Sequence, residues 1–145
     1  MNPFRYTISF RLRHPTMDPA EISRGLGASP SFSWKAGENR TTPTGQQLQG
    51  VNVSTYWCSE PLQGQDSELA AAIASDLSIR EAHRRFLTDF CSTGGVIEYF
   101  IGWFANGLNV GETFDSELLK RLADLKIDLS FDVYGDENHT PSEGT

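Results

Sequence analysis

Residues 4–13 alternate strictly between apolar and polar side chains, and this pattern limits the fold more than any other feature of the sequence. The apolar positions are Tyr6, Ile8, Phe10 and Leu12. Successive side chains of an extended strand point to opposite faces, so this segment predicts a strand with one buried and one polar face. Such a strand needs neighbouring strands beside it and a second layer over its apolar face.

Three more stretches predict strands. Residues 96–104 are apolar on both faces apart from Glu98, which is typical of a central strand. Residues 51–59 alternate with Trp57 on the apolar side, and residues 127–134 alternate in the same way.

Helices are predicted between these strands by their capping residues. Asp18 followed by Pro19 starts a helix that stops at Gly25 or Gly27. Residues 66–68 start a second helix, and a capping box at Ser78 separates it from a third. A fourth helix begins at Thr113 or Asp115 and buries a leucine stripe over residues 118–125.

The predicted order is therefore β-α-β-α-α-β-α-β. It indicates one α+β domain over residues 1–134, ferredoxin-like (split βαβ), with a mainly antiparallel sheet and helices packed on one face. Residues 135–145 are polar and are expected to form a flexible tail.

A ferredoxin-like order places the last strand antiparallel beside the first. Arg11 and Arg13 would then face Asp128 and Asp132 across the two strands. The same polar face would carry a further set of side chains: Asn52, Ser54, Tyr56, Glu98 and Ser130. Two interpretations stay open, a solvated face whose charges hold the strand register or a concave surface that meets a partner or a small ligand.

Residues 28–50 are rich in Ser, Thr, Pro, Gly and Gln. We expect a short extended piece at residues 32–37 and a mobile segment over residues 38–50. Trp34 stands beside Lys35 and close to Arg40, which suits a binding hot spot. The alternative is that the Trp34 ring packs this segment onto the sheet.

No signature of catalysis, metal binding or cofactor binding occurs in the sequence, so we predict no catalytic residue, no metal site and no cofactor. The three histidines, His14, His83 and His139, are expected to be ordinary surface residues. Cys58 and Cys91 are expected to be free, partly buried thiols.

Charge is unevenly distributed along the chain. Residues 1–40 carry six basic and three acidic side chains, a balance of +3, whereas the remaining residues carry six and sixteen, a balance of −10. The acidic whole argues against nucleic-acid binding and is compatible with a protein partner. No signal peptide and no apolar stretch long enough to cross a bilayer is apparent, so we expect a cytoplasmic protein without membrane contact.

Six short motifs occur in a fixed order along nearly the whole chain: DPAEI (18–22), GLG (25–27), SWKAG (33–37), YWCS (56–59), SELLKRL (116–122) and LSFDVY (129–134). This ordered set resembles the bacterial domain-of-unknown-function family 4279 (DUF4279). The resemblance implies a standalone α+β domain, and it implies no reaction and no cofactor.

Our first hypothesis is a non-enzymatic protein-binding module. By analogy with other small single-domain proteins, it would be an immunity protein that neutralises a bacterial toxin or effector. The alternative is a small-ligand module or a weakly marked enzyme, with its pocket between the Trp34 segment and the sheet. A homo-oligomer that pairs through a sheet edge is a third possibility.

Overall fold

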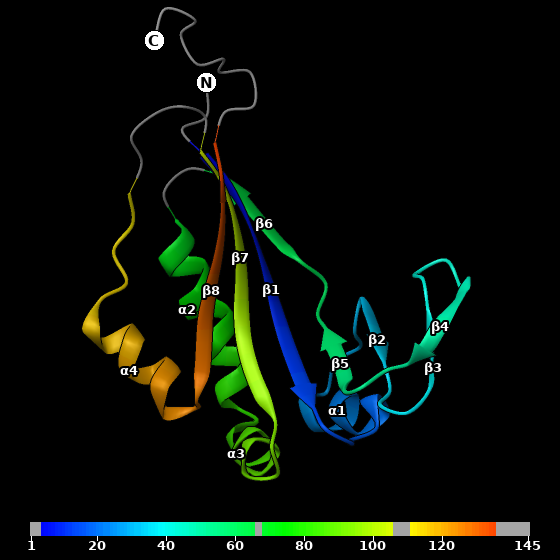
Figure 1. The fold of residues 1–145 in the computed structure, drawn as a ribbon. Coiled ribbons are helices and arrows are strands. Elements are labelled where there is room, and N and C mark those ends of the chain that lie inside the picture. Colours follow the sequence, from blue (N-terminus) through cyan, green and yellow to red (C-terminus); the bar gives the residue numbers. More distant parts are fainter. Residues whose placement is uncertain (1–3, 66–67, 106–110, 136–145) are drawn as a thin grey trace, which may run out of the picture.

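A six-stranded, mostly antiparallel sheet with helices against one face forms the body of the molecule (Figure 1). The computed structural model describes residues 4–65, 68–105 and 111–135. The main strands are β1 (Phe4–His14), β2 (Phe32–Trp34), β5 (Thr55–Cys58), β6 (Leu62–Gln65), β7 (Val96–Ala105) and β8 (Ile127–Tyr134). Their order is β2-β5-β1-β7-β8, and β6 also pairs with β1. The α+β class and the mainly antiparallel sheet are confirmed.

Strand β1 lies in the middle of the sheet, where both of its edges are occupied. One edge pairs antiparallel with β7 along almost its whole length. The other edge is shared, because β5 pairs with its second half and β6 with its first half. Between the two, Ser59 keeps the ladder closed: its N–H donates to the Phe10 carbonyl at 3.0 Å, and its hydroxyl accepts from the Phe10 N–H at 2.9 Å.

The predicted strand order was wrong. β8 does not lie beside β1 but pairs with β7, and the pair is parallel. The edge of β1 that a ferredoxin-like order reserves for the last strand is taken by β5 and by β6, which the sequence pattern did not reveal. Arg11 and Arg13 therefore do not face Asp128 and Asp132; the residue opposite Arg11 is Glu98, which in turn pairs with Asp128.

Four helices accompany the sheet in the described part of the chain: α1 (Pro19–Leu26), α2 (Leu69–Glu81), α3 (Arg84–Ser92) and α4 (Ser116–Asp124). The Asp18 carboxylate accepts from the Ala20 N–H at 2.9 Å, and Gly27, with a φ of 63°, ends α1. Asp115 caps α4 by accepting from the Leu118 N–H. Both starts agree with the sequence.

The predicted break between the second and third helices was misplaced. α2 continues through Ser78, whose hydroxyl donates to the Ala74 carbonyl one turn earlier instead of capping a new helix. α3 begins six residues later, at Arg84. The expected cap at residue 66 lies outside the described residues, as do the tail residues 136–145.

Residues 38–50, predicted to be mobile, form a β-hairpin of β3 (Asn39–Thr41) and β4 (Gln47–Val51). It stands beside the main sheet as a separate two-stranded unit (Figure 1). The predicted strand over residues 51–59 is consequently shorter. Val53 is 92% exposed, and Asn52 instead ties the hairpin base by donating to the Lys35 carbonyl at 2.9 Å.

The core fills the space between the helices and the apolar face of the sheet. Its buried side chains come from β1, β5, β7, β8, all four helices and the end of α4: Tyr6, Ile8, Phe10, Leu12, Ile22, Leu26, Trp57, Leu69, Ile73, Leu77, Leu87, Phe90, Ile97, Tyr99, Ile101, Leu118, Leu122, Leu125 and Ile127. Trp57 is fully buried, as expected for the apolar side of its strand. None of the helices in the described segments has the length and apolar character needed to cross a membrane.

Candidate functional site

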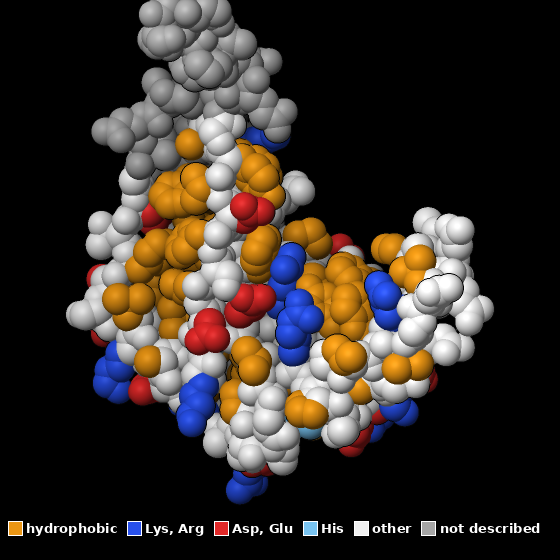
Figure 2. Space-filling model, in the orientation of Figure 1, with side chains coloured by type: hydrophobic (Ala, Val, Ile, Leu, Met, Phe, Trp, Pro, Cys, Tyr) orange, Lys and Arg blue, Asp and Glu red, His pale blue; other side chains and the backbone are white. Residues whose placement is uncertain are grey.

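The sheet face that points away from the helices is divided into two chemically different halves (Figure 2). Over β2, β5 and β1, aromatic side chains lie beside arginines, and we call this the aromatic–arginine patch: Phe32, Trp34, Tyr56, Arg11 and Arg13. Over β7 and β8 the same face carries carboxylates, the acidic half: Glu98, Asp128 and Asp132. The strand alternation predicted this face, although the strand order that places its halves differs.

The three aromatic rings of the patch contact one another. Trp34 pairs with Tyr56 in the β2–β5 ladder, and their rings stack at 4.6 Å with an interplanar angle of 26°. The Phe32 ring lies 5.5 Å from Tyr56 and 6.1 Å from Trp34. Tyr56 is buried beneath the others, and burial raises the pKa of its hydroxyl to about 12. Phe32 and Trp34 remain 42% and 37% exposed.

Both arginines of the patch lie on aromatic rings. The Arg13 guanidinium carbon is 4.6 Å from the centre of the Tyr56 ring, and that of Arg11 is 3.8 Å from the centre of the Phe100 ring. Neither arginine forms an ion pair with any residue that the structure describes. The Arg11 Nε is buried and has no hydrogen-bond partner among those residues. A buried donor without an acceptor is unfavourable.

The acidic half begins at the strand next to Arg11. Glu98 accepts a hydrogen bond from the Ser130 hydroxyl, and Asp132 accepts one from the Tyr134 hydroxyl. Glu98 is thus engaged with β8, although it lies opposite Arg11 in the ladder. The border between the positive and the negative half of this face therefore runs between the paired strands β1 and β7.

Lys35 and Arg40, the other two predicted site residues, make contacts of their own near the hairpin. The Lys35 ammonium pairs with Asp18 at 3.4 Å, which ties the end of β2 to the start of α1. Arg40 Nη1 donates to the Gln49 carbonyl at 3.1 Å across the β3–β4 hairpin. The Lys35 contact thus holds β2 against α1, and the Arg40 contact holds the hairpin together.

The Trp34 ring packs onto the sheet through Tyr56 and presents more than a third of its surface to solvent. Its packing role is therefore observed, and its role as a binding hot spot stays a prediction. The two stacked rings leave no room for a ligand between them, and a pocket elsewhere between the Trp34 segment and the sheet stays a prediction as well.

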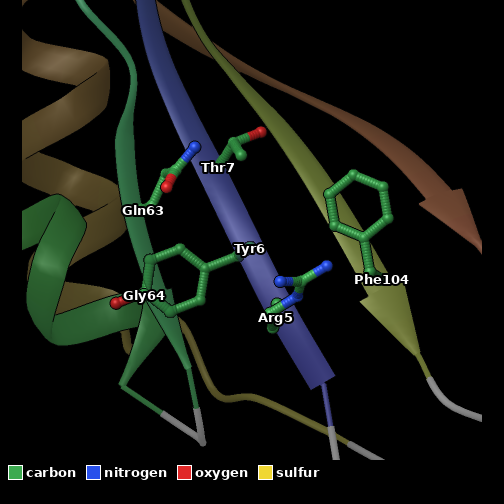
Figure 3. Close-up of a pocket in the computed structure, with 6 residues that line it drawn as sticks. All are labelled: Arg5, Tyr6, Thr7, Gln63, Gly64 and Phe104. Carbon is green, nitrogen blue, oxygen red and sulfur yellow. The ribbon is translucent and has the colours of Figure 1, made fainter.

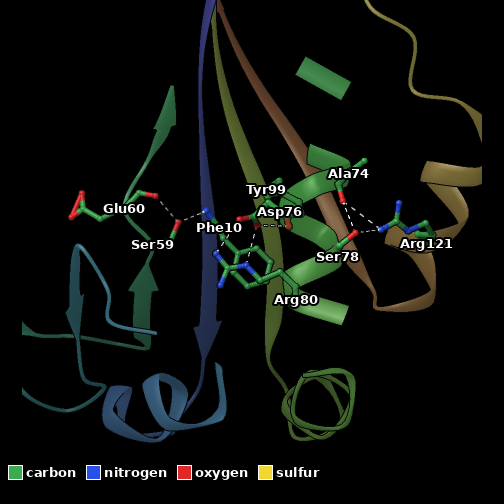
Figure 4. A network of polar contacts seen from close by, with 9 residues as sticks. All are labelled: Phe10, Ser59, Glu60, Ala74, Asp76, Ser78, Arg80, Tyr99 and Arg121. Atoms are coloured by element: carbon green, nitrogen blue, oxygen red, sulfur yellow. Dashed lines mark hydrogen bonds and ion pairs between the residues drawn. The ribbon is translucent and has the colours of Figure 1, made fainter. Parts of the chain in front are cut away.

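A cleft that sequence reasoning missed lies on the helix side of the sheet, between α2 and the β5–β6 break (Figure 4). Its volume is about 180 Å³. Buried charges lie at its floor: Asp76 accepts from the Tyr99 hydroxyl at 2.6 Å and from Arg80 Nε at 3.0 Å. The sequence contains a feature that could have indicated this cleft. Asp76 and Arg80 lie on the same side of the helix as Ile73, and charged residues on the core-facing side of a helix are unusual.

A larger hollow of about 390 Å³ lies at the start of β1, lined by Arg5, Tyr6, Thr7, Gln63, Gly64 and Phe104 (Figure 3). Gly64 is required here, since a Cβ at this position would approach the Tyr6 hydroxyl oxygen to 2.1 Å.

The prediction for the histidines was wrong for His14, which is buried at the end of β1. Its Nδ1 accepts from the N–H groups of Thr16 and Met17 at 3.1 and 3.0 Å, and its Nε2 lies 2.8 Å from the Thr93 hydroxyl. Burial lowers the pKa of the His14 imidazole.

Both cysteines are free, as predicted. The described residues contain no group of three or more His, Cys, Asp or Glu side chains placed to hold a metal ion.

Comparison with known proteins adds one finding. A family model described as "Domain of unknown function (DUF4279)" matches residues 4–136, which includes every helix and strand of the structure. A search of curated proteins and a search of solved structures both found no match. The family resemblance carried by the six sequence motifs is thereby confirmed.

Proposed function

The chain belongs to the DUF4279 family of domains of unknown function, and we propose that it is a non-enzymatic protein-binding module that contacts its partner through the aromatic–arginine patch. One observation carries this proposal. Arg11 and Arg13 stack on aromatic rings at the solvent-facing side of the sheet and have no carboxylate partner among the described residues.

The residue types and their rigidity suit an interface centre. Trp, Tyr and Arg are enriched in binding hot spots, which lie in well-packed, desolvated parts of an interface. Here the Trp34 ring is held by Tyr56, and Tyr56 in turn supports the Arg13 guanidinium. The side chains are ordered before binding, so little conformational entropy is lost when a partner meets them.

The charges of the face specify the chemistry of the partner. Carboxylates that meet Arg11 and Arg13 would gain charge-assisted hydrogen bonds, and an apolar side chain would cover Phe32 and Trp34. The neighbouring acidic half disfavours a uniformly acidic partner. A protein surface with carboxylates beside an apolar anchor, and basic residues next to them, therefore fits best. The prediction that the binding partner is a bacterial toxin or effector is not yet tested.

The test compares what three versions of the chain capture from an extract of the source cells. The patch variant carries Trp34→Ala and Arg13→Gln, and a matched control carries Arg84→Gln and Arg85→Gln on the exposed side of α3. We expect at least one protein to be captured by the wild type and the control and lost with the patch variant.

The captured protein is then purified, and its affinity is measured with each version. Loss of the Trp34 ring and the Arg13 charge should weaken binding by at least thirtyfold, while the control changes it by less than threefold. Equal affinity for the patch variant, or capture of the same set of proteins by all three versions, would refute the proposal. Folding of every variant is checked by circular dichroism.

A further inference from the structure

The cleft between α2 and the β5–β6 break is a second site, and we propose that it binds a small monocarboxylate whose oxygens are held by Arg80. The site lies on the helix side of the sheet and is independent of the aromatic–arginine patch. Its rim is exposed at Ser29, Glu60 and Leu62, whereas Arg80 at its floor is only 8% exposed. The cleft is therefore open to solvent and has a buried cation at its end.

Arg80 keeps donors that the protein does not use. Its Nε and Nη2 hydrogen bond to Asp76 at 3.0 and 3.5 Å, and the Tyr99 hydroxyl also accepts from Arg80. At least two of the five guanidinium N–H groups thus remain for a ligand. The guanidinium also lies 4.3 Å from the centre of the Phe10 ring, which fixes its plane. A fixed guanidinium fork matches the two oxygens of a carboxylate.

Two nearby carboxylates could oppose an anion, but each is accounted for. Asp76 is occupied by Arg80 and by the Tyr99 hydroxyl, which donates to the same Oδ2. The Glu60 side chain is exposed and points away from Arg80 (Figure 4). The Ser59 hydroxyl donates to the Glu60 carbonyl at 3.2 Å and accepts from the Phe10 N–H at 2.9 Å. Its donor and its acceptor are thus both engaged within the protein.

The walls and the volume define the rest of the ligand. Apart from Arg80, Asp76 and Ser59, the inner lining is apolar: Ile8, Phe10, Ala28, Trp57 and the Tyr99 ring. A volume of about 180 Å³ corresponds to roughly six water-sized groups at ~30 Å³ each. A carboxylate with three or four carbons fills this space, and the butyrate ion has six heavy atoms.

The experiment titrates the full chain with butyrate, butyramide and butylamine at constant ionic strength, followed by the tryptophan indole N–H signals in NMR. Trp57 lines the cleft and its indole donates to the Ser23 hydroxyl at 3.0 Å, whereas Trp34 is on the opposite face. We expect saturable shifts of the Trp57 signal with butyrate, at least tenfold weaker binding of butyramide, and no response to butylamine. Shifts of Trp34 alone, equal binding of all three compounds, or no saturable shift would overturn the proposal.

Two variants locate the binding groups. Arg80→Met removes the guanidinium and should weaken butyrate binding at least tenfold. Because this change leaves Asp76 buried without its cation and can impair folding, Ala28→Leu serves as the second variant. It fills the cleft without touching the ion pair and should also abolish the Trp57 shift.

The matched control is Ala71→Leu, which makes the same change at an exposed position of α2 that does not line the cleft. This variant should bind butyrate as the wild type does. Unchanged binding by folded Ala28→Leu would overturn the assignment of the site.

Discussion

The buried hydrogen bonds that Asp76 accepts from Tyr99 and Arg80 can be tested quantitatively by removing a single oxygen atom. Tyr99→Phe removes the hydroxyl that donates to Asp76 Oδ2 at 2.6 Å and keeps the ring, which packs 5.0 Å from the Phe10 ring. Tyr99 is fully buried, so water does not replace the lost donor. Hydrogen bonds to charged groups contribute ~1.5–3 kcal/mol, and we expect a loss of about 2 kcal/mol in the free energy of unfolding.

Urea unfolding followed by circular dichroism measures this loss. With a denaturant slope of ~2 kcal/mol/M, which is in the ordinary range for small proteins, the midpoint should fall by roughly 1 M. Tyr134→Phe is the matched control, because it removes a hydroxyl that donates to an aspartate, Asp132, at an exposed position. Exposed pairs of this kind contribute little, so no measurable shift is expected.

Two results would refute this reasoning. If Tyr99→Phe and Tyr134→Phe shift the midpoint equally, burial does not determine the strength of the Tyr99–Asp76 bond. If Tyr99→Phe is as stable as the wild type, Arg80 alone satisfies Asp76, and the hydroxyl is dispensable. The second result would also weaken the case that Asp76 is too well occupied to repel an anion in the cleft.

Two further predictions concern His14 and Gly25. Burial lowers the pKa of His14 in the folded chain below its ordinary 6.5. Between the pKa of the folded chain and that of the unfolded chain, the unfolded chain binds more protons, so the free energy of unfolding should fall as pH drops below about 6.5. His14→Gln should flatten this dependence in urea unfolding at pH 5 to 7.5, whereas His83→Gln should not; an unchanged slope in His14→Gln would contradict the assignment. Gly25→Ala places a Cβ 2.3 Å from the Phe86 ring and should cost ~1–3 kcal/mol of unfolding free energy. Gly111→Ala, whose new Cβ meets no atom of the described residues within 4 Å, should be neutral, and equal midpoints for the two variants would show that Phe86 moves aside freely.

Local patterns in the sequence predicted most elements because each depends on a few neighbouring residues. The alternation of residues 4–13 set β1, and Asp18 and Asp115 marked helix starts through their own side-chain hydrogen bonds. The predicted helix break at Ser78 was wrong because it also relied on local sequence alone. Its hydroxyl can cap a helix or bond back to residue 74, and only the continuing contacts of α2 with the core select the second.

The strand order could not be read in this way, since it depends on a strand without a pattern. β6 is four residues long, contains Gly64 and exposes Leu62 to 42%, so neither alternation nor apolar content marks it. Together with β5 it nevertheless occupies the edge of β1 where the last strand was expected, and β8 pairs with β7 instead. Alternation is a local property, and it correctly placed the charged residues of β1, β7 and β8 on the face opposite the core, although Asn52 and Ser54 precede β5 and lie outside the sheet. The expected pairing of Arg11 and Arg13 with aspartates was wrong, because strand pairing depends on contacts between distant parts of the chain.

The break between β5 and β6 connects the unexpected topology to the unexpected cleft. A continuous strand over residues 55–65 would pair with β1 throughout and would bring its side chains against Phe10 and α2 without a gap. Instead the chain leaves the ladder after Cys58 and returns at Leu62, and Ser59 compensates by accepting the Phe10 N–H with its side chain. This one hydroxyl satisfies the backbone of β1 at the place where the neighbouring strand opens. The opening exposes a floor on which Arg80 and Asp76 face Phe10, and this explains how two charged side chains can be kept on the core stripe of α2.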